Sequence, residues 1–280
     1  MRERAIQFGS HRGLVGIVTT PDGQTSSDAA RPKRAIVMAN VGLHHRVGPY
    51  RLYVDIARRA AANGLVALRF DLSGLGDSAA RPGGMSDRER ALIDMAEGMA
   101  WLEAKLGIKE FVVIGLCSGV DVAHPIAVQD PRVVGGIFID GYTYSTAESR
   151  VRRRKRFFQL QRWTRFIARK RAERARGWVT QPPADQQLFV RDYPEQSAFR
   201  TDVSSMVQRG ARLLFIWTGT YSQYNHEHQL YEMLGGVIPR GSVDVEYMTD
   251  ADHVFTAIQH RERLLDRITG WMASSRDEAH

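Results

Sequence analysis

The chain has 280 residues, 43% of them hydrophobic, which is enough to bury a full core, and it contains one cysteine. A single cysteine excludes disulfides within the chain and cysteine-based metal clusters, and no stretch approaches the roughly 18 apolar residues of a membrane span. The net charge of +8 is unevenly distributed, because residues 150–176 carry +12 and the remainder therefore carries −4. No signal peptide is visible at the start, so we expect a cytoplasmic protein.

The first part of the chain alternates buried strands with helices. A hairpin is predicted first, with strands at Ala5–Phe8 and Leu14–Thr19. A buried strand at Ala35–Asn40 and a helix at Pro49–Asn63 follow. A second buried strand at Leu65–Phe70 and a long helix at Asp87–Leu106 complete this part.

Residues 111–119 read Phe-Val-Val-Ile-Gly-Leu-Cys-Ser-Gly, which is a strand running into a nucleophile elbow. The chain turns sharply there, so the residues two before and two after the nucleophile must be nearly free of side chain. Gly115 and Gly119 meet this demand around Cys117, whereas the same positions around Ser118 hold larger residues. We therefore predict that the thiol is the nucleophile, ionised with help from the dipole of the following helix.

After the elbow the alternation continues, with an interruption over residues 148–207. A helix at Val120–Gln129 and a strand at Val133–Ile139 are predicted before the interruption. After it come a strand at Arg212–Trp217 and a short helix at His226–Leu234, and then a strand at Val243–Met248 and a closing helix at Val254–Ala273. This order predicts an α/β fold, with a mostly parallel sheet, helices on both faces and catalytic loops at the carboxyl ends of the strands.

The partners of the nucleophile should follow it as acid and then histidine. His253 lies between the last strand and the last helix, so we assign it as the general base. Asp140 ends the strand after the elbow and is our first choice for the acid that orients it. The more usual loop, after Trp217, holds no aspartate. Glu227, Asp252 or a Cys–His dyad without an acid remain open.

An oxyanion hole needs backbone N–H groups from the residue after the nucleophile and from the loop after the third strand. Ser118 would supply the first, and Val41 or Gly42 the second. His44 and His45, with the arginine that follows them, could line the pocket entrance or contact an anionic substrate. No carboxylate or third histidine is spaced to complete a metal site with them, so we expect no metal and no cofactor.

A glycine-rich loop follows the strand that ends at Phe70, and its acids Asp71 and Asp77 are expected to be structural. With the elbow, the late Asp-His, the sequence Arg-Phe-Asp-Leu-Ser-Gly-Leu-Gly-Asp-Ser at 69–78 and this strand order, the chain resembles the α/β-hydrolase superfamily over nearly its whole length. More narrowly, the segment from 42 to 78 with Gly-Leu-Cys at 115–117 looks like hydrolases associated with exosortase and exopolysaccharide systems. A cysteine at the elbow is also similar to dienelactone hydrolases.

The resemblance implies the roles of nucleophile, base and oxyanion donor assigned above, and cleavage of esters, thioesters, lactones or amides. Some members transfer acyl groups instead. We expect an acyl hydrolase that forms a thioester on Cys117 with a small-molecule or carrier-bound acyl substrate. An acyltransferase with the same acyl-enzyme, or a non-catalytic scaffold that binds a ligand or partner, are the alternatives. The oligomeric state is left open.

Residues 147–207 stand where this superfamily carries cap insertions, which leaves 1–146 and 208–280 as the core. Apolar residues recur there at helical spacing between arginines, at Phe157, Leu160, Trp163, Phe166 and Ile167. This pattern predicts an amphipathic lid helix, with Trp163 toward the substrate. Basic amphipathic helices with aromatic residues also favour anionic membrane surfaces, so contact through 150–176 is a second interpretation. Nucleic acid binding is not expected, because no nucleic-acid module accompanies the charge.

Overall fold

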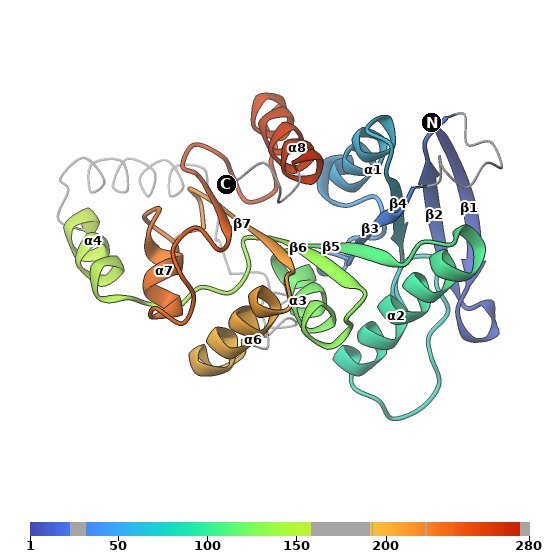
Figure 1. Ribbon diagram of the computed structural model, residues 1–280, viewed down its shortest axis with the longest axis horizontal. Coiled ribbons are helices and arrows are strands. Elements are labelled where there is room, and N and C mark those ends of the chain that lie inside the picture. The colour runs from blue at the N-terminus through green and yellow to red at the C-terminus, as the bar shows by residue number, and fades with distance from the viewer. Residues whose placement is uncertain (23–31, 158–190, 192, 222, 275–280) are drawn as a thin grey trace, which may run out of the picture.

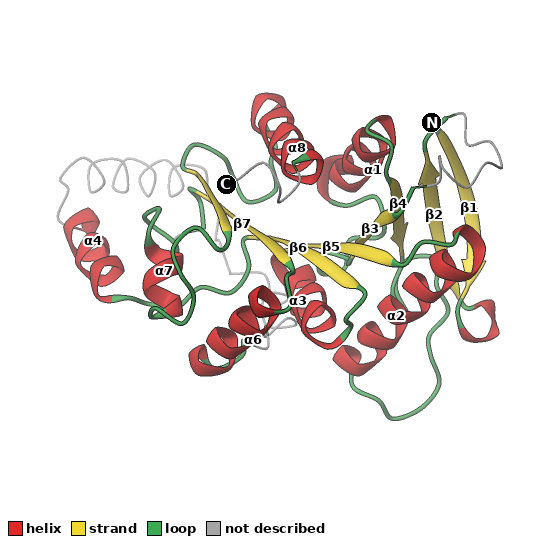
Figure 2. Ribbon diagram, in the orientation of Figure 1, coloured by secondary structure: helices red, strands yellow, loops and turns green. Residues whose placement is uncertain are grey.

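Eight strands form one mixed sheet in the computed structural model, which describes residues 1–22, 32–157, 191, 193–221 and 223–274. The strand order is β1-β2-β4-β3-β5-β6-β7-β8. Helices cover both faces of this sheet (Figure 1), and Figure 2 shows the same layers coloured by secondary structure. The predicted α/β class, with a mostly parallel sheet between helices, is confirmed.

The strands divide into an antiparallel edge and a parallel remainder. β1 (Arg2–Phe8) and β2 (Leu14–Thr20) form the predicted hairpin, and β2 also pairs antiparallel with β4 (Val66–Phe70). The other strands run parallel to β4: β3 (Arg34–Met38), β5 (Glu110–Leu116), β6 (Val133–Ile139), β7 (Arg212–Thr218) and β8 (Asp244–Met248). The loops that follow these five strands therefore gather at one edge of the sheet, where open α/β folds bind ligands.

The helices lie in two layers (Figure 1). One face carries α1 (Leu52–Ala62) and α8 (Ile258–Ala273), and the other carries α2 (Asp87–Leu106), α3 (Val120–Gln129) and α6 (Gln196–Gln208). The remaining helical elements are α4 (Ala147–Phe157), α7 (Gln229–Leu234) and the 3-10 turns at Ser10–Arg12, Pro49–Arg51 and Cys117–Gly119. Each face of the sheet has its own hydrophobic cluster. None of the helices in the described ranges is long and apolar enough to cross a membrane.

The closing helix begins later than predicted, at Ile258 instead of Val254. The carboxylate of Asp252 accepts hydrogen bonds from the backbone N–H groups of Val254 and Thr256, at 3.0–3.2 Å. These bonds hold residues 252–256 in a turn, because a short acidic side chain competes with the helix for nearby N–H groups. The turn sets the position of His253 between β8 and α8.

The predicted cap range, 147–207, contains α4 at its start and most of α6 at its end. On α6, Phe199, Val203 and Met206 are buried in the same hydrophobic cluster as Phe215 of β7. The described end of the range thus packs on the sheet. Residues 158–190, with Trp163, lie outside the described residues, so the division into core and cap stays a prediction.

Candidate active site

Cys117 occupies the turn between β5 and α3, at the carboxyl edge of the sheet. Its φ is 54°, in the left-handed region that residues with side chains rarely adopt. The 3-10 turn Cys117–Gly119 leads directly into α3, so the thiol stands at the start of a helical segment. The side chain is half-buried. This is the geometry that a nucleophile elbow requires.

The two glycines of the elbow are required by close backbone approaches. A Cβ placed on Gly115 would lie 2.5 Å from the carbonyl oxygen of Gly119. A Cβ on Gly119 would lie 2.8 Å from the carbonyl oxygen of Asn40, on the loop after β3. The spacing that pointed to Cys117 in the sequence therefore has a steric cause in the fold.

His253 bridges the thiol and a buried carboxylate. Its ring interacts with the Cys117 thiol and favours the ionised form of that thiol, and its Nδ1 lies 2.6 Å from Oδ2 of Asp140. The histidine comes from the loop after β8 and the aspartate from the end of β6. Together with the cysteine after β5, they form a row of three side chains in contact, which we call the contact chain. Cys117, His253 and Asp140, predicted separately from the sequence, are brought together.

Asp140 is completely buried, with a φ of 46°. Thr218, the last residue of β7, donates its backbone N–H to Oδ1 and its hydroxyl to Oδ2, both at 2.7 Å. With His253, these donors satisfy the buried carboxylate and fix its plane. Thr218 follows Trp217, at the strand end where the acid is more usually found, and it holds the acid that the neighbouring strand β6 supplies.

The other two candidate acids lie elsewhere. Glu227 is exposed in the turn before α7 rather than inside a helix, and its carbonyl accepts a hydrogen bond from the Tyr224 hydroxyl. The Asp252 carboxylate caps the turn that leads to Thr256. Asp140 is accordingly the carboxylate that contacts His253.

The electrostatics of the contact chain favour an ion pair. Burial disfavours the Cys117 thiolate, yet the hydrogen bond and charge of His253, with the charge of Arg191, outweigh it and hold the thiol pKa below its ordinary value. The hydrogen bonds to Asp140 and then to Cys117 raise the pKa of His253 to about 10. These contacts therefore shift the pair toward the thiolate of Cys117 and the imidazolium of His253.

The two predicted oxyanion donors face each other across the elbow. The backbone N–H of Gly42 donates to Oγ of Ser118 at 2.7 Å, and the backbone N–H of Ser118 is one of the groups that lower the pKa of the Cys117 thiol. Val41 is buried beside Gly42. The Asn40 side chain fastens this loop, because its Nδ2 donates to the carbonyl of His44 and its Oδ1 accepts from the loop after β4. The loop after β3 is thus positioned against the nucleophile.

His44 and His45 are exposed on this same loop, so their predicted contact with substrate stays a prediction. The arginine after them has a different role from the one expected. The guanidinium of Arg46 pairs with the carboxylates of Asp71 and Asp77. The backbone N–H of Arg46 also donates to Oδ1 of Asp71, at 2.6 Å. Its charge is therefore engaged within the protein. The expected structural role of both aspartates is confirmed.

A cluster of four residues beside the site was not found from the sequence. Arg191 forms a two-point ion pair with Asp121 of α3, at 2.7 and 3.1 Å. The same guanidinium donates to the hydroxyls of Tyr193 and Tyr221. The ring of Tyr221 stacks on His253, with centroids 5.9 Å apart and planes inclined by 13°. These four residues belong to no recognisable sequence motif, and Arg191 lies within the predicted cap range 147–207, so the sequence did not point to them.

Comparison with protein families gives a match to the family described as "Alpha/beta hydrolase family", over residues 36–267. Among solved structures, the chain is similar to an alpha-beta serine hydrolase homologue from Coxiella burnetii, at 14% identity and a TM-score of 0.59, with 98% of this chain and 99% of that chain covered. A serine hydrolase without a lid from Xanthomonas campestris is 15% identical, with 98% and 97% covered and a TM-score of 0.56.

An esterase from Pyrococcus furiosus is 17% identical, with 97% of this chain and 90% of that chain covered and a TM-score of 0.57. No curated protein matches the sequence. At these identities the structural likenesses establish the fold, which is the α/β-hydrolase fold predicted from the sequence.

Proposed function

The chain belongs to the alpha/beta hydrolase family, and from that premise we propose that it is an acyl hydrolase of ester, thioester or lactone type with Cys117 as its nucleophile. The observation that carries the proposal is the contact chain from the Cys117 thiol through His253 to Asp140. A nucleophile, a base and an orienting carboxylate in mutual contact are the arrangement that acyl transfer requires.

In the first half-reaction, the thiolate of Cys117 attacks the substrate carbonyl carbon and a C–S bond forms. The carbonyl electron pair moves to oxygen, where the backbone N–H groups of Ser118 and of Val41 or Gly42 stabilise it. Collapse of this intermediate breaks the bond to the leaving group. The imidazolium of His253 gives the leaving group its proton, and a thioester remains on the enzyme.

In the second half-reaction, neutral His253 takes a proton from water, and the resulting hydroxide attacks the thioester. The C–S bond breaks, the carboxylic acid leaves and the thiolate is restored. Asp140, held by the two hydrogen bonds from Thr218, orients the ring of His253 and stabilises the imidazolium. An alcohol or amine in place of water would make the same enzyme an acyltransferase.

The narrower resemblance to exosortase-associated hydrolases supports a thiol at the elbow. The depressed pKa of Cys117 supports it physically, because the thiolate is the reactive form. The adjacent hydroxyl of Ser118 instead accepts a hydrogen bond from Gly42, at 2.7 Å. These contacts favour sulfur over oxygen as the attacking atom.

The test is the mass of the intact protein after incubation with p-nitrophenyl esters and acyl thioesters of several chain lengths. We expect one acyl group per chain on the wild type and none on Cys117→Ala. Ser118→Ala is the matched variant, because it removes the neighbouring hydroxyl and keeps the thiol, and its adduct should persist.

Turnover of the same substrates separates the outcomes. Release of free acid that rises with time supports hydrolysis, whereas acylated amine or alcohol formed at the expense of acid supports transfer. An adduct that survives in Cys117→Ala and disappears in Ser118→Ala would overturn the assignment of the nucleophile. No adduct and no turnover with any substrate would favour the binding scaffold.

A further inference from the structure

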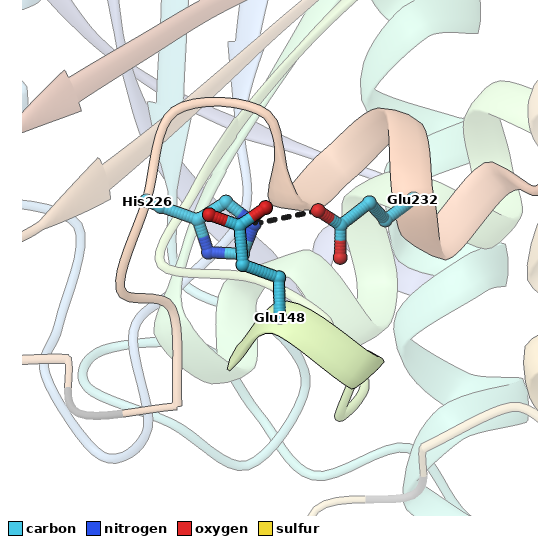
Figure 3. Close-up of side chains that lie close together, drawn as sticks. All are labelled: Glu148, His226 and Glu232. Carbon is cyan, nitrogen blue, oxygen red and sulfur yellow. Dashed lines mark hydrogen bonds and ion pairs between the residues drawn. The ribbon is translucent and has the colours of Figure 1, made fainter. Parts of the chain in front are cut away.

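A second group of ionisable side chains lies between α4 and α7 and shares no residue with the candidate active site. Figure 3 shows Glu148 from α4, His226 from the loop before α7 and Glu232 from α7 pointing toward one another. One nitrogen or oxygen from each residue lies within 4.8 Å of the other two. Histidine nitrogen and carboxylate oxygen are common ligands of zinc.

The histidine is held so that one defined nitrogen faces the carboxylates. Its Nδ1 lies 2.9 Å from Oδ1 of Asn225, and Nδ2 of Asn225 donates to the carbonyl of Ser149 at 3.0 Å. Because the Asn225 amide nitrogen is used in that bond, its oxygen accepts from Nδ1–H. His226 is 5% exposed. Its Nε2 therefore faces the cluster, and metal-binding histidines are usually oriented by such a bond at the other nitrogen.

The carboxylates meet this nitrogen from two elements. Oε1 of Glu232 lies 2.9 Å and Oε2 of Glu148 lies 3.8 Å from Nε2 of His226. A tetrahedral zinc with bonds near 2.1 Å separates its ligand atoms by about 3.4 Å, a value between these two distances. The other oxygen of Glu148 pairs with Arg152 at 2.5 Å, which orients the carboxylate and leaves Oε2 toward the histidine.

The contact of 2.9 Å between Nε2 of His226 and Oε1 of Glu232 therefore brings together two atoms of the kinds that zinc binds. We propose that Glu148, His226 and Glu232 form a site for a divalent cation of the zinc type, with water in the remaining position. Two carboxylates against the single charge of Arg152 leave a net negative charge at the site before the metal binds.

The site would join two parts of the fold. Glu148 belongs to the first turn of α4, where the predicted cap range 147–207 begins, and the other two ligands belong to the region of α7 (Figure 1). A bound cation would therefore fasten the start of that range to the core. This inference does not depend on the reaction proposed for Cys117.

The test is a calorimetric titration of the full chain with Zn²⁺ after treatment with a chelator. Cys117 and His253 can also bind zinc, so Cys117 is first alkylated with iodoacetamide. We expect one Zn²⁺ per chain, with affinity lowered at least tenfold in Glu148→Gln, His226→Gln and Glu232→Gln. Glu227→Gln is the matched control, because Glu227 is exposed, neighbours His226 and loses the same charge.

Hydrogen exchange of the α4 amides supplies a readout that a remote binding site would not move. Zn²⁺ should slow exchange over 147–157 in the wild type and leave it unchanged in Glu148→Gln. Circular dichroism without metal checks that each variant is folded. Zinc affinity that is the same in the alkylated wild type and in all three variants would overturn the proposal, and the cluster would then be an imidazolium ion pair.

Discussion

The reactivity of Cys117 is set by the charges beside it. His253 and Arg191 lower the thiol pKa although burial raises it, so the thiolate should persist at pH values where an ordinary cysteine is protonated. With a pKa near 8.5, such a cysteine is about 0.3% thiolate at pH 6. We predict that iodoacetamide alkylates the wild type at least about tenfold faster than His253→Gln at pH 6, with the difference shrinking above pH 9.

The measurement is the rate of mass increase of the intact chain, which reports one site because the chain has one cysteine. His44→Gln, which removes an exposed histidine, should leave the rate unchanged. Equal rates for the wild type and His253→Gln at pH 6 would contradict the ion pair.

Thr218 positions the acid without touching the thiol. Thr218→Val keeps the shape and the backbone N–H but removes the hydroxyl that donates to Oδ2 of Asp140 at 2.7 Å. A hydrogen bond to a charged group contributes about 1.5–3 kcal/mol, so we predict a fall in kcat of roughly tenfold or more with little change in KM.

Steady-state kinetics with the best ester from the acylation panel gives this comparison. Thr201→Val, on the exposed side of α6, is the control. An unchanged kcat in Thr218→Val would mean that the remaining donors hold Asp140 well enough alone.

Single residues differ in how visible they are in the sequence. Cys117 could be predicted because the elbow constrains its neighbours, and Asp140 because it ends a buried strand. Thr218 was not recognised, because its role depends on two adjacent strands ending side by side. Arg191 and His226 were missed because each also depends on a partner far away in sequence, Asp121 for Arg191 and Glu148 for His226, which only the packing of the fold brings into contact.

At the scale of elements, the elbow depends on a close contact between the start of α3 and the end of β3. Gly119→Ala would place a Cβ 2.8 and 3.1 Å from the backbone oxygens of Asn40 and Ala39, which cannot withdraw without moving the loop after β3. We predict a loss of about 1–3 kcal/mol in the free energy of unfolding, and slower acylation of Cys117.

Gly270→Ala is the matched control in α8. Its Cβ would meet nothing within 4 Å, and alanine is favoured over glycine in a helix by about 0.5–1 kcal/mol. Urea unfolding should therefore move in opposite directions for the two variants. Equal changes would show that the elbow tolerates the added carbon.

Most elements could be predicted, because buried strands and amphipathic helices leave clear periodicity. The boundaries of α3 and β6 agree with the prediction to the residue. The helices α7 and α8 begin at Gln229 and Ile258, three and four residues later than predicted. Before α8, the hydrogen bonds from the backbone N–H groups of Val254 and Thr256 to the Asp252 carboxylate hold these residues in a turn, and composition does not reveal such bonds.

For the molecule as a whole, His253 links stability to pH. Its pKa is about 10 in the folded chain, against about 6.5 in an unfolded chain. A raised folded pKa stabilises the fold fully below about pH 6.5, and the contribution is lost as the pH rises through the folded value. Cys117→Ala removes the titration of the thiol and keeps Asp140, the largest cause of the shift.

We compare the free energy of unfolding of the single variant Cys117→Ala with that of the double variant Cys117→Ala/His253→Gln. We predict that the single variant is the more stable, that the difference is largest near pH 6, and that it decreases toward pH 10. Urea unfolding of both variants across this range gives the comparison. An excess that grows with pH would show that His253 is neutral in the folded chain.

The distribution of charge over the whole chain predicts how it meets membranes. Residues 150–176 carry +12 and the remainder −4, so attraction to an anionic surface should act through one segment. Most of this segment lies outside the described residues, but Arg153 and Arg154 are exposed on α4. A basic residue near an anionic bilayer contributes about 1 kcal/mol, and salt screens the attraction within a Debye length of about 10 Å at 0.1 M.

We therefore predict binding to vesicles containing phosphatidylserine at low salt, and its loss at high salt. Arg153→Gln/Arg154→Gln should weaken binding by roughly tenfold or more, since two contributions of about 1 kcal/mol are removed. Lys109→Gln/Arg240→Gln changes the net charge equally at exposed positions outside the segment and should have little effect. Sedimentation with the vesicles measures both. Equal weakening by the two pairs would show that net charge, and not this segment, drives adsorption, and the arginines would then be the solvated face of a lid.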